Sequence, residues 1–261
     1  MLPVTLVFRN PERQARRKWL QLPETPGGAF IVLFWTWWAL LAIFNTWPQI
    51  DIATAHLFFA ATACTDEAKQ ICGSFPYSDE HLLRIIRRVF FQLPYVTAIV
   101  LLVMLFACYQ QHGATFDAAR VRKLKVALGT FVIGPGLLIN GILKAFSGRP
   151  RPYETDLFGG PLPFVDAGSF AGKCIGNCSF ISGEAASAGW LFCLIFLIPQ
   201  PARSALALPI AAISFLMTAL RVAFGGHYLS DVTLGWLSTL VIFTALLALS
   251  EKSHHQKKSG I

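Results

Sequence analysis

The chain has 261 residues, of which 54% are hydrophobic and 14% are charged, and its mean hydropathy is +0.54. Soluble domains are much less apolar, so this composition excludes an ordinary soluble domain and favours an integral membrane protein. The formal net charge is +8, but the basic residues are divided among several loops and form no continuous basic face. This pattern indicates contact with anionic lipid surfaces rather than with nucleic acid.

Six apolar runs predict an all-α fold, a polytopic bundle of six transmembrane helices with short periplasmic helices. Most of the runs approach the roughly 20 residues that cross about 30 Å of hydrocarbon. No soluble second domain interrupts them, so we expect one membrane domain over residues 1–261, with a basic lead-in at 1–27 and a tail at 250–261. The runs cover residues 28–47, 90–109, 126–143, 183–199, 204–220 and 231–249.

The distribution of Lys and Arg predicts that both termini are cytoplasmic. With six spans, 13 of the 22 basic residues fall on the side that holds the N-terminus, and cytoplasmic loops carry the excess of positive charge. The first apolar run exceeds the roughly 7 to 15 residues of a secretory signal core, so we expect it to anchor the chain rather than to be cleaved.

The segment at 48–89 leaves the first span on the outer side. Residues 53–63 are apolar and helix-prone, and His81, Arg84 and Arg88 would share one face of a following helix. We expect this helix to be an interfacial anchor; the alternative is a basic contact for a phosphorylated headgroup.

Four cysteines fall on the predicted outer side: Cys64, Cys72, Cys174 and Cys178. Four cysteines allow three pairings, and the pairs Cys64–Cys72 and Cys174–Cys178 close two local loops. An oxidising periplasm would favour these disulfides. A zinc site is the alternative, but the spacings Cys-x7-Cys and Cys-x3-Cys without nearby histidines fit it poorly.

Three charged clusters converge on the outer face when the spans alternate in direction. Lys144 and Arg151 follow the third span, Glu184 opens the fourth, and the last cluster joins the fifth span to the sixth. Ionisable groups at the mouth of a membrane segment are costly, and they mark a functional site by default. The last cluster consists of Arg221, His227 and Asp231.

The cationic residues of these clusters suit phosphate oxygens. Lys144 offers a point charge, and Arg151 and Arg221 each offer a planar fork. Ser182 and Gly183 at a helix start would add backbone donors and the positive end of the helix dipole. We expect Arg151 to bind rather than Arg149, which belongs to the same basic turn.

The remaining residues predict phosphoryl transfer without a metal. His227 and Asp231 are four residues apart, so the carboxylate can fix the imidazole tautomer and leave a neutral nucleophile. Glu184 could protonate a leaving oxygen or serve as a structural hydrogen-bonding group. The sequence contains neither a phosphate-binding loop of the form Gly-x4-Gly-Lys-Ser/Thr nor an acidic cluster that would hold Mg²⁺.

These residues resemble the three-part signature of the type 2 phosphatidic acid phosphatase superfamily, within about residues 130–235. The resemblance implies that the Lys and Arg positions bind phosphate, that His227 becomes phosphorylated and that Asp231 orients it. The matching pieces are Lys144-x6-Arg151-Pro152, Ser182-Gly183 and Arg221-x5-His227-x3-Asp231.

The chain departs from the superfamily pattern at Glu184, where the general acid of the family is a His, and at Leu220, where a Ser is usual. The chain also contains Ile133-Gly134-Pro135-Gly136, Gly148-Arg149-Pro150-Arg151-Pro152, Asn177-Cys178-Ser179-Phe180-x-x-Gly183 followed by an acid, and Gly225-Gly226-His227. Together these pieces resemble the bacterial lipid A 4′-phosphatases, and members of that subgroup can carry a carboxylate at position 184. The resemblance therefore implies a phosphatase of the inner membrane that removes the 4′-phosphate of lipid A at the periplasmic face.

We accordingly expect a membrane phosphomonoesterase that needs no cofactor, no nucleic acid and no obligate protein partner, and whose substrate is a phosphorylated lipid. Undecaprenyl pyrophosphate, phosphatidylglycerol phosphate and a phosphotransferase reaction are alternatives within the enzyme class. A catalytically silent lipid-phosphate binder or transporter is the alternative from another class.

Overall fold

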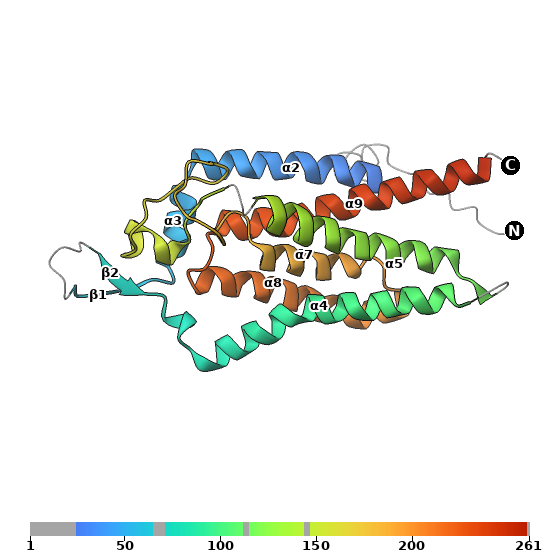
Figure 1. The fold of residues 1–261 in the computed structure, drawn as a ribbon, viewed down its shortest axis with the longest axis horizontal. Coiled ribbons are helices and arrows are strands. Elements are labelled where there is room, and N and C mark those ends of the chain that lie inside the picture. Colours follow the sequence, from blue (N-terminus) through green and yellow to red (C-terminus); the bar gives the residue numbers. More distant parts are fainter. Residues whose placement is uncertain (1–24, 65–70, 112–114, 144–146, 260–261) are drawn as a thin grey trace, which may run out of the picture.

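The computed structural model describes residues 25–64, 71–111, 115–143 and 147–259, and it is an elongated helical bundle with loops and short elements gathered at one end (Figure 1). A short helix, α7 (Gly183–Leu194), lies inside the bundle. The long helices are α2 (Pro26–Thr46), α4 (His81–Tyr109), α5 (Ala118–Phe131) continued by the π-helix η3 (Val132–Leu143), α8 (Gln200–Ala223) and α9 (Leu229–Ser259). The short elements at the loop end are α3 (Gln49–His56), β1 (Ala60–Thr62), β2 (Cys72–Ser74), η1 (Pro76–Ser78), η4 (Pro152–Glu154) and η5 (Asp156–Phe158).

Within the described residues, five helices are long and apolar enough to cross a membrane. They correspond to five of the six apolar runs of the sequence, although α4 begins nine residues before the predicted run and is continuous with the basic segment that precedes it. The five are Pro26–Thr46, His81–Tyr109, Ala118–Leu143, Gln200–Ala223 and Leu229–Ser253.

The predicted run at 183–199 is the one that differs. Its helix, α7, has 12 residues, which at about 1.5 Å per residue reach only about 18 Å. Most of its side chains are buried, because small residues let the neighbouring helices approach closely. A Cβ on Gly189 would lie 2.5 Å from the carbonyl oxygen of Trp236 on α9. This helix is therefore the buried centre of the bundle.

The sequence Gly134-Pro135-Gly136 changes the winding of the third predicted run. The structure has a π-helix here, which continues α5 without a break in the helical segment. Proline lacks the backbone N–H that an α-helical hydrogen bond would need. The side chain of Asn140 donates to the carbonyl oxygen of Pro135 at 2.7 Å.

The described part of the chain is mostly helical, as predicted, but its outer loops are less helical than the sequence suggested. The run at 53–63 is helical only to His56, and β1 then pairs with β2 in an antiparallel hairpin. The register places Thr62 opposite Cys72, and a disulfide joins Cys64 to Cys72 at the end of the two strands. A second disulfide joins Cys174 to Cys178, so the structure has the local pairing.

A buried ion network connects α3, the loop after η3 and the start of α9. Arg149 is 0% exposed, and its guanidinium lies 2.8 Å from Asp51 and 2.6 Å from Asp231, which are also fully buried. Arg149 also donates to Ser230 Oγ and to the carbonyl oxygen of Val165. Burial by itself would lower the pKa of the Arg149 guanidinium, but the two carboxylates outweigh that cost, and the pKa is raised above its ordinary value.

Removal of Arg149 should therefore destabilise the fold. We expect Arg149→Met to lower the free energy of unfolding by about 3–5 kcal/mol, because two buried carboxylates lose their counter-charge. The measurement is reversible denaturation of the purified protein in detergent. Arg151→Met is the matched control, because this side chain is only partly buried; equal losses for the two variants would contradict a structural role specific to Arg149.

Candidate active site

The candidate site lies at the loop end of the bundle, where the turn between α8 and α9 meets the first turn of α7. A cavity of about 490 Å³ opens there. Its lining includes four arginines from three different parts of the chain: Arg84, Arg87, Arg151 and Arg221. The site therefore has the concentrated positive charge that an anionic group requires.

The α8–α9 turn fixes Arg221 and His227 relative to each other. Gly225 has a φ of +61°, a left-handed conformation that glycine adopts at no steric cost. The backbone amides of Gly226 and His227 both donate to the carbonyl oxygen of Arg221, at 3.0 and 3.2 Å. A Cβ on Gly226 would lie 2.6 Å from the Arg221 guanidinium, so this glycine leaves the space that the arginine occupies.

The position of His227 determines which of its nitrogens carries the proton. The ring is 2% exposed, and Nδ1 lies 2.8 Å from the carbonyl oxygen of Ser179. A carbonyl oxygen can only accept, so the hydrogen bond requires a proton on Nδ1. In the neutral imidazole, Nε2 then carries the lone pair, which is the state that a nucleophilic histidine needs.

Asp231 lies behind this pair, although its contact with the imidazole differs from the expected one. Its Oδ2 is 3.9 Å from His227 Nδ1, whereas the Ser179 hydroxyl donates to the same carboxylate oxygen at 2.5 Å. The backbone amide of Tyr228 also donates to Asp231, at 2.9 Å. Ser179 therefore stands between the acid and the histidine, with its carbonyl on the ring and its hydroxyl on the carboxylate.

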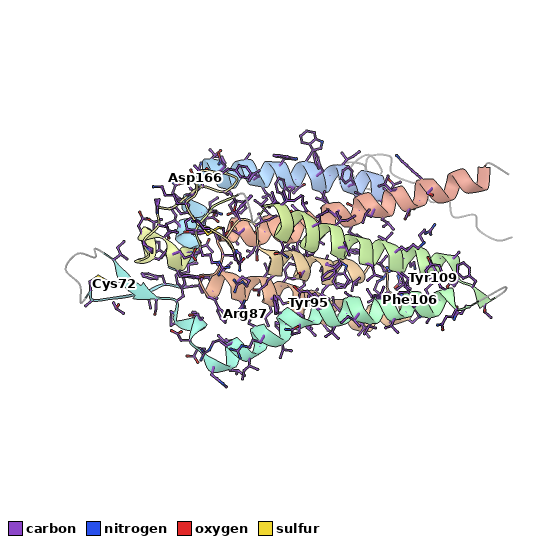
Figure 2. All side chains as sticks on the ribbon, viewed as in Figure 1. Cys72, Arg87, Tyr95, Phe106, Tyr109 and Asp166 are labelled. Carbon is purple, nitrogen blue, oxygen red and sulfur yellow. A yellow bond between two sulfur atoms is a disulfide. The ribbon has the colours of Figure 1, made fainter. Side chains whose placement is uncertain are left out.

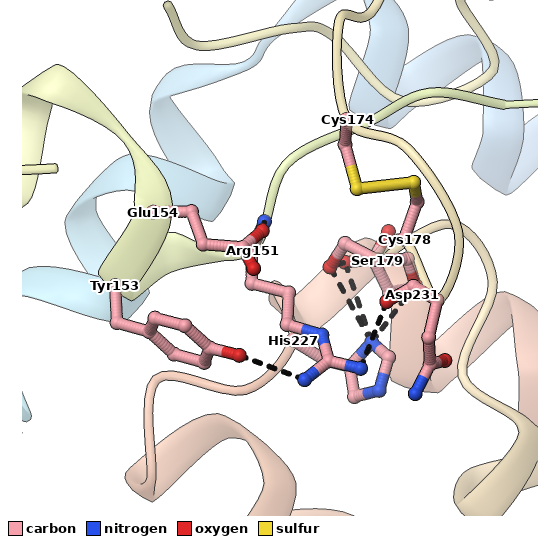
Figure 3. Close-up of a disulfide and its surroundings, with 9 residues drawn as sticks. Arg151, Tyr153, Glu154, Cys174, Cys178, Ser179, His227 and Asp231 are labelled. Carbon is pink, nitrogen blue, oxygen red and sulfur yellow. Dashed lines mark hydrogen bonds and ion pairs between the residues drawn. A yellow bond between two sulfur atoms is a disulfide. The ribbon is translucent and has the colours of Figure 1, made fainter. Parts of the chain in front are cut away.

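Ser179 is a site residue that sequence reasoning did not single out. Its backbone amide donates to the carbonyl oxygen of Arg149 at 2.8 Å, and it directly follows Cys178, whose disulfide to Cys174 closes the loop above the site (Figure 3). Ser179 belongs to the motif Asn177-Cys178-Ser179-Phe180, but the motif gave it no role, because the sequence does not show which backbone carbonyl faces the histidine.

Arg151 and Arg221 both direct polar atoms into the cavity. Arg151 donates to the Tyr153 hydroxyl at 2.8 Å and to the carbonyl oxygen of Asn177 at 2.9 Å (Figure 3). The Nε atoms of Arg151 and Arg221 are buried and donate to no acceptor within the described part of the chain. Buried donors usually have partners, so a bound anion in this cavity would complete the pattern.

Glu184 lies at the first turn of α7 and contacts two arginines. Arg87 donates to both of its oxygens, from Nη2 at 2.5 Å and from Nε at 3.2 Å. Arg221 Nε lies 3.5 Å from Glu184 Oε1. The carboxylate therefore links α4 to the end of α8 through a bridge of alternating charge.

The other predicted phosphate-binding residues have mixed outcomes. Lys144 lies outside the described residues. The backbone amide of Ser182 donates to the carbonyl oxygen of Asp231 at 3.0 Å, and its hydroxyl caps α7 by accepting from the amide of Ala185. Gly183 lines a neighbouring cavity, and a Cβ there would clash with the Asn140 side chain. Ser182 thus holds the helix start against α9.

Arg87 is the functional candidate that the helical pattern missed. We grouped His81, Arg84 and Arg88 on one face, whereas the cavity is lined by Arg84 and Arg87. Figure 2 labels Arg87 on the N-terminal part of α4. Arg88 is exposed and is not part of the lining. A helical wheel gives the spacing of side chains but cannot tell which of two adjacent faces turns toward α7.

Another cavity, of about 640 Å³, lies next to Glu184 and toward the middle of the bundle. Its apolar wall consists of Phe91 and Tyr95 on α4 and Met217 on α8. Asn140 and Ser187 contribute polar groups. A cavity lined by four arginines therefore lies near a second cavity whose lining includes two aromatic side chains and a methionine.

Comparison with known proteins agrees with this geometry. Residues 123–254, just over half of the chain, match the model of the PAP2 superfamily. A protein named lipid A 4′-phosphatase from Rhizobium etli is 61% identical over 93% of this chain and 95% of its own length, and one of the same name from Rhizobium leguminosarum is 60% identical over 88% of this chain and its full length.

A more distant relative of that name, from Francisella tularensis subsp. novicida, is 28% identical over 85% of this chain and 95% of its own length. No solved structure matches the chain. The family match covers α7, α8, the turn between α8 and α9, and most of α9, a segment that carries Glu184, Arg221, His227 and Asp231. The chain therefore belongs to the PAP2 superfamily and, within it, to the family of the lipid A 4′-phosphatases.

Proposed function

We propose that this protein is a phosphoric monoester hydrolase of the bacterial inner membrane that removes the 4′-phosphate of lipid A. The observation that carries this proposal is His227, with its Nδ1 on the Ser179 carbonyl, beside a cavity lined by four arginines. The names of the relatives at 61% and 60% identity supply the substrate. The adjoining cavity with Phe91, Tyr95 and Met217 suits the apolar part of a lipid.

The proposed reaction has two steps. The phosphate group binds between Arg151 and Arg221, with Lys144 as the third cation that the sequence predicts. His227 Nε2 attacks phosphorus, the bond from phosphorus to the sugar oxygen breaks, and that oxygen takes up a proton. Water then attacks the phosphohistidine and releases inorganic phosphate. The arginines stabilise the charge on the transferring group throughout.

Asp231 and Glu184 have supporting roles in this scheme. Asp231 acts on His227 through the Ser179 hydroxyl, which it accepts at 2.5 Å, and through the 3.9 Å approach to Nδ1. The assignment of Glu184 as the proton donor to the leaving oxygen stays a prediction from the sequence. Its contacts with Arg87 and Arg221 support a second role, as the salt-bridge partner of two arginines.

His227→Ala should abolish the reaction while preserving the fold. Loss of the nucleophile should reduce turnover by about 1,000-fold or more. The measurement is mass spectrometry of lipid A from a host that produces the protein, in parallel with the variant and an empty vector. Loss of one phosphate from the non-reducing sugar with the wild type alone is the expected result.

Unchanged lipid A in the presence of well-expressed wild type would contradict the substrate. Phosphate release from undecaprenyl pyrophosphate and phosphatidylglycerol phosphate would then be measured. If the wild type and His227→Ala behaved identically with all three lipids, the protein would be a lipid-phosphate binder rather than an enzyme.

The proposal includes a topology of six crossings with both termini in the cytoplasm and the site in the periplasm. The helices alternate in direction if α7 and the turns at 195–198 count as one crossing. The basic residues at the start of α5, from Arg120 to Lys125, and those of the C-terminal tail support this orientation by the positive-inside rule. Two disulfides at the opposite end of the bundle also support it, since they form in oxidising compartments.

Reporter fusions should establish this topology. Green fluorescent protein fused to the C-terminus should fluoresce, and alkaline phosphatase at the same position should be inactive, because the latter needs an oxidising compartment. Alkaline phosphatase fused after Tyr77, in the loop before α4, should be active. The reverse pattern would place the site on the cytoplasmic side.

A further inference from the structure

Glu184 forms salt bridges to Arg87 and Arg221, and the three signature motifs do not account for the contact with Arg87. Arg87 comes from α4, which lies outside the segment that matches the family model. Its guanidinium makes two hydrogen bonds to Glu184, and the same carboxylate faces Arg221 at 3.5 Å. Both arginines line the cavity beside His227, whereas Glu184 lines the neighbouring one.

The cavity lining carries more positive charge than Glu184 alone can neutralise. This excess favours a bound anion with more than one negative charge. The lining holds Arg84, Arg87, Arg151 and Arg221, with Asp79 as its acidic residue. Glu184 approaches from behind and offsets one of these positive charges. The excess left over matches a doubly charged phosphate monoester, whose oxygens accept hydrogen bonds from planar arginine forks.

We propose, on the basis of the function proposed above, that Arg87 is a further phosphate-binding residue and that Glu184 positions Arg87 and Arg221 instead of donating a proton. A carboxyl group can donate only when it carries a proton. Both oxygens of Glu184 accept hydrogen bonds from Arg87, so a proton on either oxygen would displace one of these contacts. The leaving oxygen then takes its proton from water in the cavity.

In this assignment, Glu184 has a different role from the histidine that most members of the superfamily have at this position. A histidine there could not hold two arginines in place by charge. The carboxylate can, and in this chain it brings α4 into the anion site through Arg87, whose side chain is 35% exposed and so needs a partner to define its direction. The specificity for a phosphate therefore extends beyond the three signature cations.

The first test measures anion binding without turnover. Inorganic phosphate should raise the melting temperature of the purified, full-length wild type, because a ligand that binds the folded state stabilises it. Arg87→Ala should weaken the apparent affinity for phosphate by about 10- to 100-fold, the loss expected for a charge-assisted hydrogen-bond pair. Arg88→Ala is the matched control on the next residue of α4 and should behave like the wild type.

The second test separates positioning from proton donation. Glu184→Gln is compared on a lipid-like phosphate ester of 4-nitrophenol, whose oxygen leaves without protonation, and on an ester of an aliphatic alcohol, whose oxygen needs a proton. Positioning predicts the same loss of kcat/KM with both esters. It also predicts little further loss in the double variant Arg87→Ala/Glu184→Gln, since the two residues act as one unit.

Two results would overturn the proposal. One is an affinity for phosphate that is the same in Arg87→Ala and Arg88→Ala; the other is a loss in Glu184→Gln that is confined to the aliphatic ester. If Arg87→Ala does not fold, Arg87→Lys replaces it, because lysine keeps the charge but cannot make the paired hydrogen bonds. If the wild type binds phosphate through Arg87 but releases none from any ester, the proposed enzymatic function is refuted. The proposed role of Arg87 in phosphate binding is then still supported.

Discussion

The candidate site depends on one buried guanidinium, that of Arg149, which sits between Asp51 and Asp231 with no exposure to solvent. Three segments far apart in the sequence, α3, the loop after η3 and the start of α9, meet at this group. A charge in such a place is stable only with its counter-charges beside it. The fold of the outer loops and the position of Asp231 are therefore consequences of the same interaction.

Two arginines that are two residues apart have opposite environments for this reason. Arg149 points into the protein, where it donates to two carboxylates and to Ser230. Arg151 faces the cavity, and its buried Nε has no protein acceptor among the described residues. Ser179 connects these two environments through three hydrogen bonds. Its amide donates to the Arg149 carbonyl, its hydroxyl donates to Asp231, and its carbonyl accepts from His227. The nucleophile is thus oriented by the backbone of a loop as well as by an acid.

The sequence was informative where the physical cost of a residue is high. Apolar runs predicted the five long helices, and the cost of ionisable groups at the mouth of a membrane segment identified Arg151 and Arg221, which line one cavity, and His227 in the turn beside Arg221. The sequence was less informative where the outcome depends on packing: α7 is a short buried helix, and Arg87 lines the cavity although a helical wheel favoured Arg88. The role of Ser179 was not predicted, because its backbone carbonyl rather than its side chain holds the histidine.

The disulfide between Cys174 and Cys178 has a consequence for the loop that contains Ser179. Cys178 is the residue before Ser179, so the bond restrains the loop that sets the proton on His227. None of the described helices contains either cysteine. Because a disulfide restricts the alternative conformations of the loop that it closes, this bond restrains the loop beside His227 rather than the helical bundle.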